Sequence, residues 1–165
     1  MQMMFDIRWC GRMADDNAMS LLQQADSLME QGQAQWDAAL ELYEKVLAVE
    51  PENQDACLNA SKIYAIRGRI PEAVKQYVTL MNIYSKSEQF KPALENAKRV
   101  LQLQPENVDV RILSIKIYKQ LNDIKSLVAE QIKLARIFLE IGKGDESIKL
   151  LKDAQEYAPS DLNIT

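Results

Sequence analysis

The chain has 165 residues, which is the size of one domain or of a short run of repeats. Its five Gly and five Pro are about half the usual share of the two residues together. This scarcity argues against β-sandwiches, collagen-like chains and disorder rich in Pro and Gly. His is absent, which excludes His-based acid–base catalysis, Ser-His-Asp and Cys-His nucleophiles and the commonest transition-metal ligand.

The charge pattern gives little reason to expect nucleic acid as the partner. The net charge is −4, although residues 54–105 hold eight basic and four acidic side chains. The two cysteines, Cys10 and Cys57, have neither disulfide-framework nor zinc spacing, which fits a reducing compartment. No window approaches 18 apolar residues, and the apolar start lacks the basic end of a signal peptide. We therefore expect no membrane span and a cytoplasmic location.

Apolar residues recur at helical spacing in eight successive segments, and Gly and Pro lie almost entirely between these segments. No segment alternates with period two over a useful length. The expected helices are, in chain order, residues 17–29, 36–47, 56–67, 71–84, 92–103, 108–121, 124–141 and 146–157. The sequence therefore predicts an all-α chain.

The prolines also reveal an internal repeat of 54 residues. Pro51, Pro105 and Pro159 are equally spaced, and residues 52–105 align with residues 106–159 without a gap. Tyr64 and Tyr118 are one of the identical pairs. Self-similarity at a fixed period indicates stacked supersecondary units, none of which can bury its apolar face alone.

The residues at fixed positions within the unit identify its type. Three helices share a small residue, a further apolar residue one turn later, and then Pro51, Pro105 or Pro159. The helices before them share a small residue, a large one and a Gly. The sets are Ala39–Tyr43–Val46, Ala93–Ala97–Val100 and Ser147–Leu151–Ala154, then Ala25–Leu28–Gly32, Ser61–Tyr64–Gly68 and Ala135–Phe138–Gly142. This pattern resembles the tetratricopeptide repeat, and residues 36–43 and 47–53 are especially similar to that family.

The resemblance covers about residues 18–159 and implies a right-handed superhelix of about eight antiparallel helices. The family's period is 34 residues, and the additional 20 correspond to one helix and its turn. We therefore interpret each 54-residue unit as three helices whose middle member is shared by two overlapping repeats. The expected organisation is an N-terminal arm or partial helix at 1–16, a repeat domain at 17–159, and a further repeat start or tail at 160–165.

No catalytic or cofactor motif stands out. Paired carboxylates such as Asp15 and Asp16 fall at helix ends, where acidic residues cap helices and complement the helix dipole. The segment Gly142-Lys-Gly144 lacks the length and the Lys-Ser/Thr end of a phosphate loop. We therefore expect no enzyme activity, no cofactor and no metal site.

Polar residues on the first and shared helices are the candidate binding residues. The family resemblance implies that such residues line a concave groove that grips a peptide or a helix. Asn and Lys suit this role because they bind backbone carbonyls and carboxylates. The candidates are Asn59, Lys62, Asn82, Lys86, Lys116, Lys119, Lys133 and Arg136. The alternative is that each of these side chains is simply solvated.

The leading hypothesis is a non-enzymatic module that binds a peptide or helical segment of a partner protein, as a scaffold, an adaptor or a chaperone does. The first alternative is a homo-oligomer that assembles through an uncapped C-terminal edge. The second is an RNA-binding helical repeat, which the basic middle segment supports and the overall acidity opposes.

Overall fold

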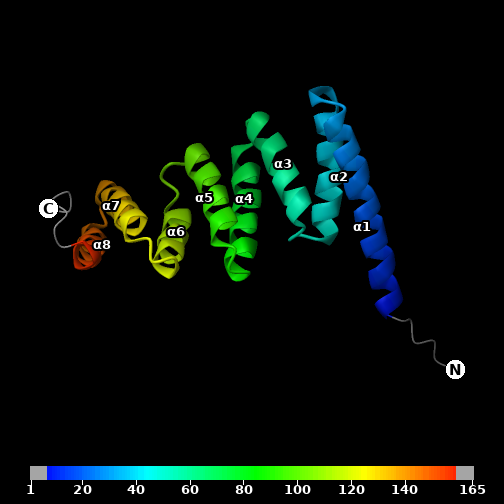
Figure 1. Ribbon diagram of the computed structural model, residues 1–165. Helices are drawn as coiled ribbons and strands as arrows, with labels where there is room; N and C mark the ends of the chain where they lie inside the picture. The colour runs from blue at the N-terminus through cyan, green and yellow to red at the C-terminus, as the bar shows by residue number, and fades with distance from the viewer. Residues whose placement is uncertain (1–6, 159–165) are drawn as a thin grey trace. The chain divides into compact units, whose positions relative to one another are not determined.

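The fold is known from a computed structural model that describes residues 7–158, with side chains described from residue 17 onward. This part of the chain forms eight α-helices and one short 3-10 helix, η1 (Gln33–Gln35), and it contains no strand (Figure 1). The helices are α1 (Ile7–Glu30), α2 (Trp36–Val49), α3 (Gln54–Ile66), α4 (Ile70–Lys86), α5 (Phe90–Leu103), α6 (Val108–Gln120), α7 (Ile124–Glu140) and α8 (Gly144–Tyr157). The prediction of an all-α helical repeat chain is therefore confirmed.

The N-terminal helix is longer than expected. It begins at Ile7, so the expected division between an arm at 1–16 and a repeat domain at 17–159 falls inside α1. Residues 1–6 and 159–165, which include Pro159 and the expected segment 160–165, lie outside the described residues.

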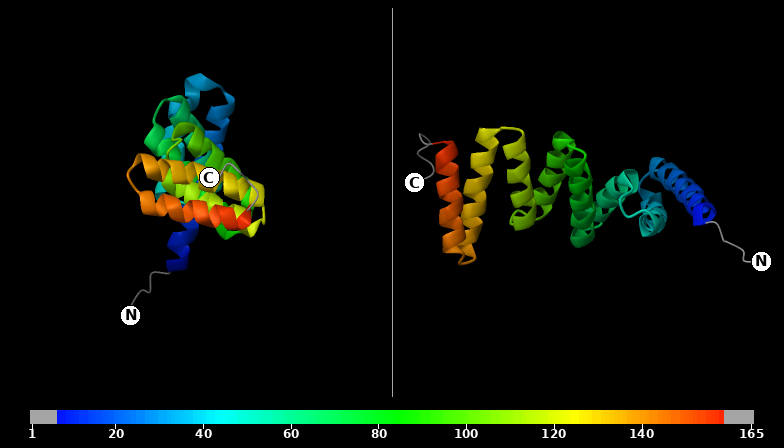
Figure 2. Two further views of the ribbon diagram at one scale, coloured as in Figure 1. Left: turned by 90° about the vertical axis from the view of Figure 1, so that its left-hand side faces the viewer. Right: turned by 90° about the horizontal axis from the view of Figure 1, so that it is seen from below.

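The chain divides into two compact units, Met1–Leu80 and Met81–Thr165, and α4 contributes residues to both. Within the first unit α1 packs on α2, and α2 packs on α3. Within the second unit α5 packs on α6, α6 on α7, and α7 on α8. The right-hand view in Figure 2 shows α7 and α8 side by side, with the chain reversing direction between them.

Small residues at the predicted positions are buried where helices approach each other. The hydroxyl of Ser147 on α8 donates a hydrogen bond of 2.8 Å to the carbonyl of Ala135 on α7. A side chain longer than Ser or Ala would separate the two helices at this point. The buried small residues are Ala25, Ala39, Ser61, Ala73, Ala93, Ala135 and Ser147.

Four helices end in the same turn, in which one residue adopts a positive φ. The N–H of the next residue donates to the carbonyl of an aromatic residue five positions earlier, as in a Schellman motif. The positive-φ residues are Gly68 (72°), Glu88 (58°), Asn122 (53°) and Gly142 (77°). The closing bonds are Arg69 to Tyr64 (2.8 Å), Gln89 to Tyr84 (2.8 Å), Asp123 to Tyr118 (3.0 Å) and Lys143 to Phe138 (2.7 Å).

A second type of turn follows α2 and α5 and contains Pro51 or Pro105. It ends at an Asn whose side-chain oxygen accepts the N–H three residues ahead. Asn53 caps α3 in this way at 3.0 Å, and Asn107 caps α6 at 3.1 Å. The cap satisfies one of the free N–H groups in the first turn of each helix.

The 54-residue period is therefore structural as well as textual. The bounds of α2, α3, α4 and α5, each increased by 54, are the bounds of α5, α6, α7 and α8. The two turn types repeat at the same spacing, because Gly68 corresponds to Asn122 and Glu88 to Gly142. This agreement supports the interpretation of the repeat as a unit of three helices.

Candidate functional site

Two of the predicted binding residues belong to one polar cluster that joins α1, α2 and α3. The hydroxyl of buried Tyr43 donates to Asp26 Oδ1 at 2.6 Å. Asn59 Nδ2 donates to Asp26 Oδ1 and to the Tyr43 hydroxyl, both at 3.2 Å, and Lys62 Nζ donates to Asn59 Oδ1 at 3.1 Å. Burial first, and then the hydrogen bond to Asp26, hold the pKa of Tyr43 well above its usual value. Of these residues only Lys62 is exposed at the surface.

The other predicted residues are spread over the second unit. Lys119 Nζ lies 5.8 Å from the centre of the Tyr157 ring, and hydrogen bonding to Tyr157 raises the pKa of the lysine. Lys133 Nζ donates to Glu130 Oε1 at 2.8 Å. The remaining four, Asn82, Lys86, Lys116 and Arg136, are exposed.

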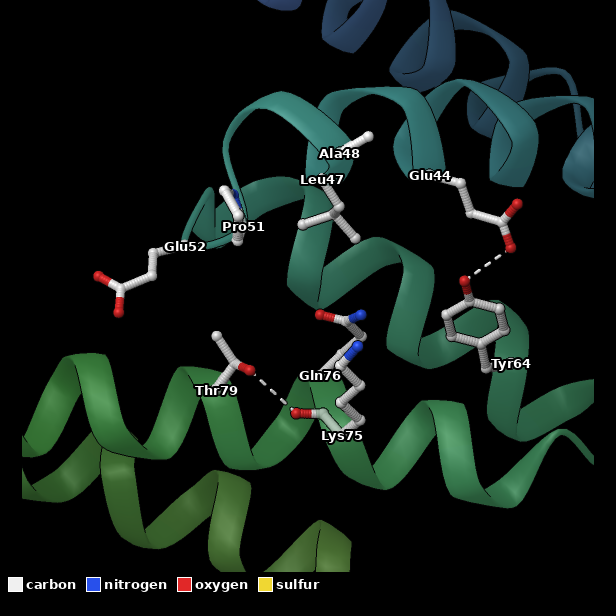
Figure 3. A pocket seen from close by; sticks show the side chains of 9 residues that line it. All are labelled: Glu44, Leu47, Ala48, Pro51, Glu52, Tyr64, Lys75, Gln76 and Thr79. Atoms are coloured by element: carbon white, nitrogen blue, oxygen red, sulfur yellow. Dashed lines mark hydrogen bonds between the residues drawn. The ribbon is translucent and has the colours of Figure 1, made fainter.

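A pocket of about 410 Å³ lies between α2, α3 and α4 in the first unit (Figure 3). We call it the first pocket. The Tyr64 hydroxyl donates to Glu44 Oε1 at 2.7 Å, and the Arg69 guanidinium lies 4.6 Å from the centre of the Tyr64 ring. Burial and then the bond to Glu44 hold the pKa of Tyr64 above its usual value. The lining residues are Glu44, Leu47, Ala48, Pro51, Glu52, Tyr64, Lys75, Gln76 and Thr79.

A buried thiol lies beside the first pocket. Cys57 Sγ is 3.3 Å from Gln76 Oε1 and 3.6 Å from the carbonyl oxygen of Pro51, so the thiol connects the proline turn to α4. Burial, with a smaller contribution from Glu52, raises the pKa of Cys57 to about 11. A thiol that stays protonated and inaccessible is a poor nucleophile.

A second pocket of about 410 Å³ lies between α5, α6 and α7 in the second unit. Arg111 donates from Nη1 to Glu130 Oε2 at 2.6 Å, and from Nη2 and Nε to the Pro105 carbonyl at 2.6 and 3.2 Å. The Arg111 and Glu130 side chains are only 10% and 12% exposed. The lining residues are Leu94, Ala97, Lys98, Leu101, Gln102, Arg111, Ser114, Tyr118, Ser126, Ala129, Glu130 and Lys133.

The two pockets are equivalent under the 54-residue shift. Seven positions that line the first pocket also line the second after the shift: Glu44/Lys98, Leu47/Leu101, Ala48/Gln102, Tyr64/Tyr118, Lys75/Ala129, Gln76/Glu130 and Thr79/Lys133. The connection from the proline turn is conserved in position but not in chemistry, because Arg111 and Glu130 replace Cys57 and Gln76. The charge of the lining is opposite: two acidic and one basic residue in the first pocket, three basic and one acidic in the second.

The sequence analysis missed most of these pocket residues. Of its eight candidates only Lys133 lines a pocket. The ungapped alignment of the repeats held a usable signal, because it places Lys98 opposite Glu44 and Arg111 opposite Cys57. Such changes of charge at aligned positions mark where equivalent surfaces diverge.

Two further properties bear on the site. Among the side chains that the structure describes, no group of three or more His, Cys, Asp or Glu residues could hold a metal ion. None of the helices, as far as they are described, has the length and apolarity needed to cross a membrane.

The comparison with protein families decides the type of repeat. Residues 28–91 match the tetratricopeptide repeat family. The matched segment includes α2, α3 and α4 and therefore the whole lining of the first pocket. The tetratricopeptide resemblance that the sequence suggested is confirmed in this segment.

Several solved tetratricopeptide repeat structures are similar to the chain. YrrB, described as a tetratricopeptide repeat protein with an unusual peptide-binding site, is 15% identical, with 91% of each chain covered and a TM-score of 0.35. A thermophilic tetratricopeptide repeat protein of Thermus thermophilus is 19% identical, with 89% of this chain and 94% of that chain covered and a TM-score of 0.32. The MamA protein is 17% identical, with 90% and 97% covered and a TM-score of 0.35. A search of curated proteins gives no match.

Proposed function

We propose that the chain is a non-enzymatic protein–protein interaction module that holds a peptide or helical segment of a partner. The observation that carries this proposal is a tetratricopeptide match over residues 28–91 that encloses a side-chain-lined pocket. The family resemblance implies peptide binding, and helical grooves with a few convergent polar groups recognise such segments. Scaffold, adaptor and chaperone roles all use a surface of this kind.

The chemistry of the described side chains supports binding rather than catalysis. The one thiol among them, Cys57, is buried, free and protonated at neutral pH. Tyr43 and Tyr64 have pKa values raised by burial and by their carboxylate partners, so both remain neutral hydrogen-bond donors. The proposal includes a cytoplasmic setting, in which a reduced buried thiol persists.

The binding surface proposed from the sequence is the exposed polar side of α3 and α6, where Lys62, Lys116 and Lys119 lie. The hydrogen bonds among Asp26, Tyr43 and Asn59 support Lys62 there because they fix the amide that its Nζ contacts. A pre-positioned donor loses less side-chain entropy when a ligand binds.

Selection of binders from a random peptide library with the intact chain tests the proposal. We expect selected peptides to bind with micromolar or tighter affinity, measured by fluorescence anisotropy. Chemical crosslinking of the bound peptide, read by mass spectrometry, then maps the contact. Failure to select any peptide, together with turnover of a substrate by the purified chain, would show that the proposal is wrong.

Self-assembly is the second candidate, and exposed aliphatic side chains of the second unit favour it. Leu139, Ile141 and Ile148 are 58%, 54% and 51% exposed. Clustered apolar side chains at a surface commonly mark contacts with another protein. Light scattering over a range of concentrations decides this question, because a strict monomer excludes the assembly.

A further inference from the structure

The first pocket already contains a carboxylate bound to its tyrosine. Glu44 Oε1 accepts the Tyr64 hydroxyl at 2.7 Å and lies 3.4 Å from Arg69 Nη1 (Figure 3 shows the bond to Tyr64). A hydroxyl that donates to a carboxylate makes a strong, charge-assisted hydrogen bond. The chain itself therefore shows how a carboxylate fits against this tyrosine.

The second pocket has the tyrosine but lacks the carboxylate. The position equivalent to Glu44 is Lys98, an exposed residue that makes no ion pair within the described part of the chain. The Tyr118 hydroxyl, equivalent to that of Tyr64, has no hydrogen-bond partner among the described residues. A free hydroxyl donor and an unpaired ammonium group thus line the same pocket.

The rest of the second pocket adds positive charge and an apolar wall. Arg111 neutralises Glu130, and Lys133 Nζ, whose side chain is 56% exposed, uses one of its three donors on the same carboxylate. Leu94, Ala97 and Leu101 supply the apolar wall from α5.

One acidic group opposes an anion here. Asp123, five residues after Tyr118, occupies the position of Arg69 in the first unit and acts electrostatically on the Tyr118 hydroxyl. Its carboxylate accepts the N–H of Ser126 at 3.1 Å, so it is held at the start of α7. The lining residues still carry three positive charges against one negative charge.

We propose that the second pocket binds an Asp or Glu side chain of a partner peptide. The carboxylate accepts the Tyr118 hydroxyl, as Glu44 accepts that of Tyr64, and it pairs with Lys98 and Lys133. An aliphatic neighbour in the peptide rests on Leu94 and Leu101. This inference rests on the proposed peptide-binding function and names the chemistry of one of its contacts.

The test uses the intact chain and two blocked tripeptides, acetyl-Leu-Glu-Leu-amide and acetyl-Leu-Gln-Leu-amide, followed by amide chemical shifts in NMR. We expect saturable shifts at residues 98, 118 and 133 with the Glu peptide, at roughly millimolar affinity. The Gln peptide should bind about tenfold more weakly, because it lacks the charge that the two lysines recognise.

Two substitutions of the same type separate this pocket from the rest of the basic surface. Lys98→Glu places a carboxylate within reach of Tyr118 and should weaken the Glu peptide at least about tenfold. Lys116→Glu makes the same charge change on α6 outside the pocket lining and should weaken it less than about twofold. Lys98→Met, which keeps the apolar stem, gives the same readout if Lys98→Glu loses the helical circular dichroism spectrum.

Equal affinity for the two tripeptides, or equal losses in Lys98→Glu and Lys116→Glu, would overturn the site. A peptide selected from the library that binds the wild-type chain and Lys98→Glu equally well would also overturn it. That last result would leave the proposed interaction module intact, so the two failures can be told apart.

Discussion

The same left-handed backbone conformation is occupied by different residues at equivalent turns. Gly68 and Asn122 are equivalent, as are Glu88 and Gly142, and all four have a positive φ. An L-residue other than Asn or Gly pays about 1 kcal/mol or more in this region, because its Cβ approaches the backbone. Glu88 is therefore the most strained of the four residues.

Exchanging residues at these turns should change stability in opposite directions. Glu88→Gly should raise the free energy of unfolding by about 1 kcal/mol, and Gly142→Ala should lower it by about as much. Nothing lies within 4 Å of a Cβ at Gly142, so backbone strain alone decides the second value. Urea unfolding followed by circular dichroism measures both. Glu88→Gln is the control, and an equal gain from it would assign the effect to charge instead.

The buried thiol predicts a pH dependence of stability. Burial raises the pKa of Cys57 from 9.0 to about 11, so the folded chain holds this proton more tightly than the unfolded chain. Its contribution is complete below about pH 9 and is lost as the pH rises to about 11, by at most about 1.4 kcal/mol per pH unit. Tyr43 and Tyr64, whose pKa values are also raised, add to the loss above about pH 10.

Urea unfolding at a series of pH values tests the assignment to Cys57. The Cys57→Ala variant should lose less stability between pH 9 and pH 10 than the wild-type chain does. Identical slopes for the two proteins would show that other groups cause the dependence.

At the scale of elements, two chemically different contacts perform the same task. Cys57 contacts the Pro51 carbonyl and Gln76, whereas Arg111 contacts the Pro105 carbonyl and Glu130. Removing one member of a nearly buried ion pair leaves an uncompensated charge, which costs about 3 to 5 kcal/mol.

A double-mutant cycle exchanges one contact for the other. Arg111→Cys should cost about 3 kcal/mol, since Lys133 still neutralises part of the charge on Glu130. The double variant Arg111→Cys, Glu130→Gln installs the contact of the first unit and should recover at least half of that loss. Urea unfolding of the four proteins gives a coupling energy of about 2 kcal/mol. Strictly additive losses would contradict the equivalence of the two contacts.

Most helix positions could be predicted because Gly and Pro separate the apolar stripes in the sequence. The end of α4 is an exception: it runs to Lys86 rather than to residue 84, and α5 begins at Phe90 rather than at Pro92. Glu88 carries the turn between them, and a Glu gives no sequence signal for a positive φ. Pro92 lies in the first turn of α5, where its missing N–H has no partner to lose.

The pockets could not be predicted in the same way, because they depend on neighbours from three helices. Helical spacing places Lys62, Lys116 and Lys119 on faces, but it does not show that Tyr64 reaches Glu44 across from α3 to α2. Cys57 and Arg111 are dissimilar residues, so their alignment gave no indication of a common role. That role became visible only through their distances to the proline carbonyls.

At the scale of the whole molecule, the account describes one pocket built twice with opposite charge. The 54-residue period gives equivalent helices, equivalent turns and equivalent tyrosines, while Glu44 and Lys98 decide what each pocket can hold. A binding module gains selectivity from such differences, because a like charge in one pocket excludes what the other accepts.

Exchanging the two charges is the most direct test of this account. In the double variant Glu44→Lys, Lys98→Glu, the shifts caused by acetyl-Leu-Glu-Leu-amide are followed by NMR. The account predicts that they move from residues 98, 118 and 133 to residues 44, 64 and 75. Shifts that stay in the second pocket, or that fail to appear in the first, would contradict it.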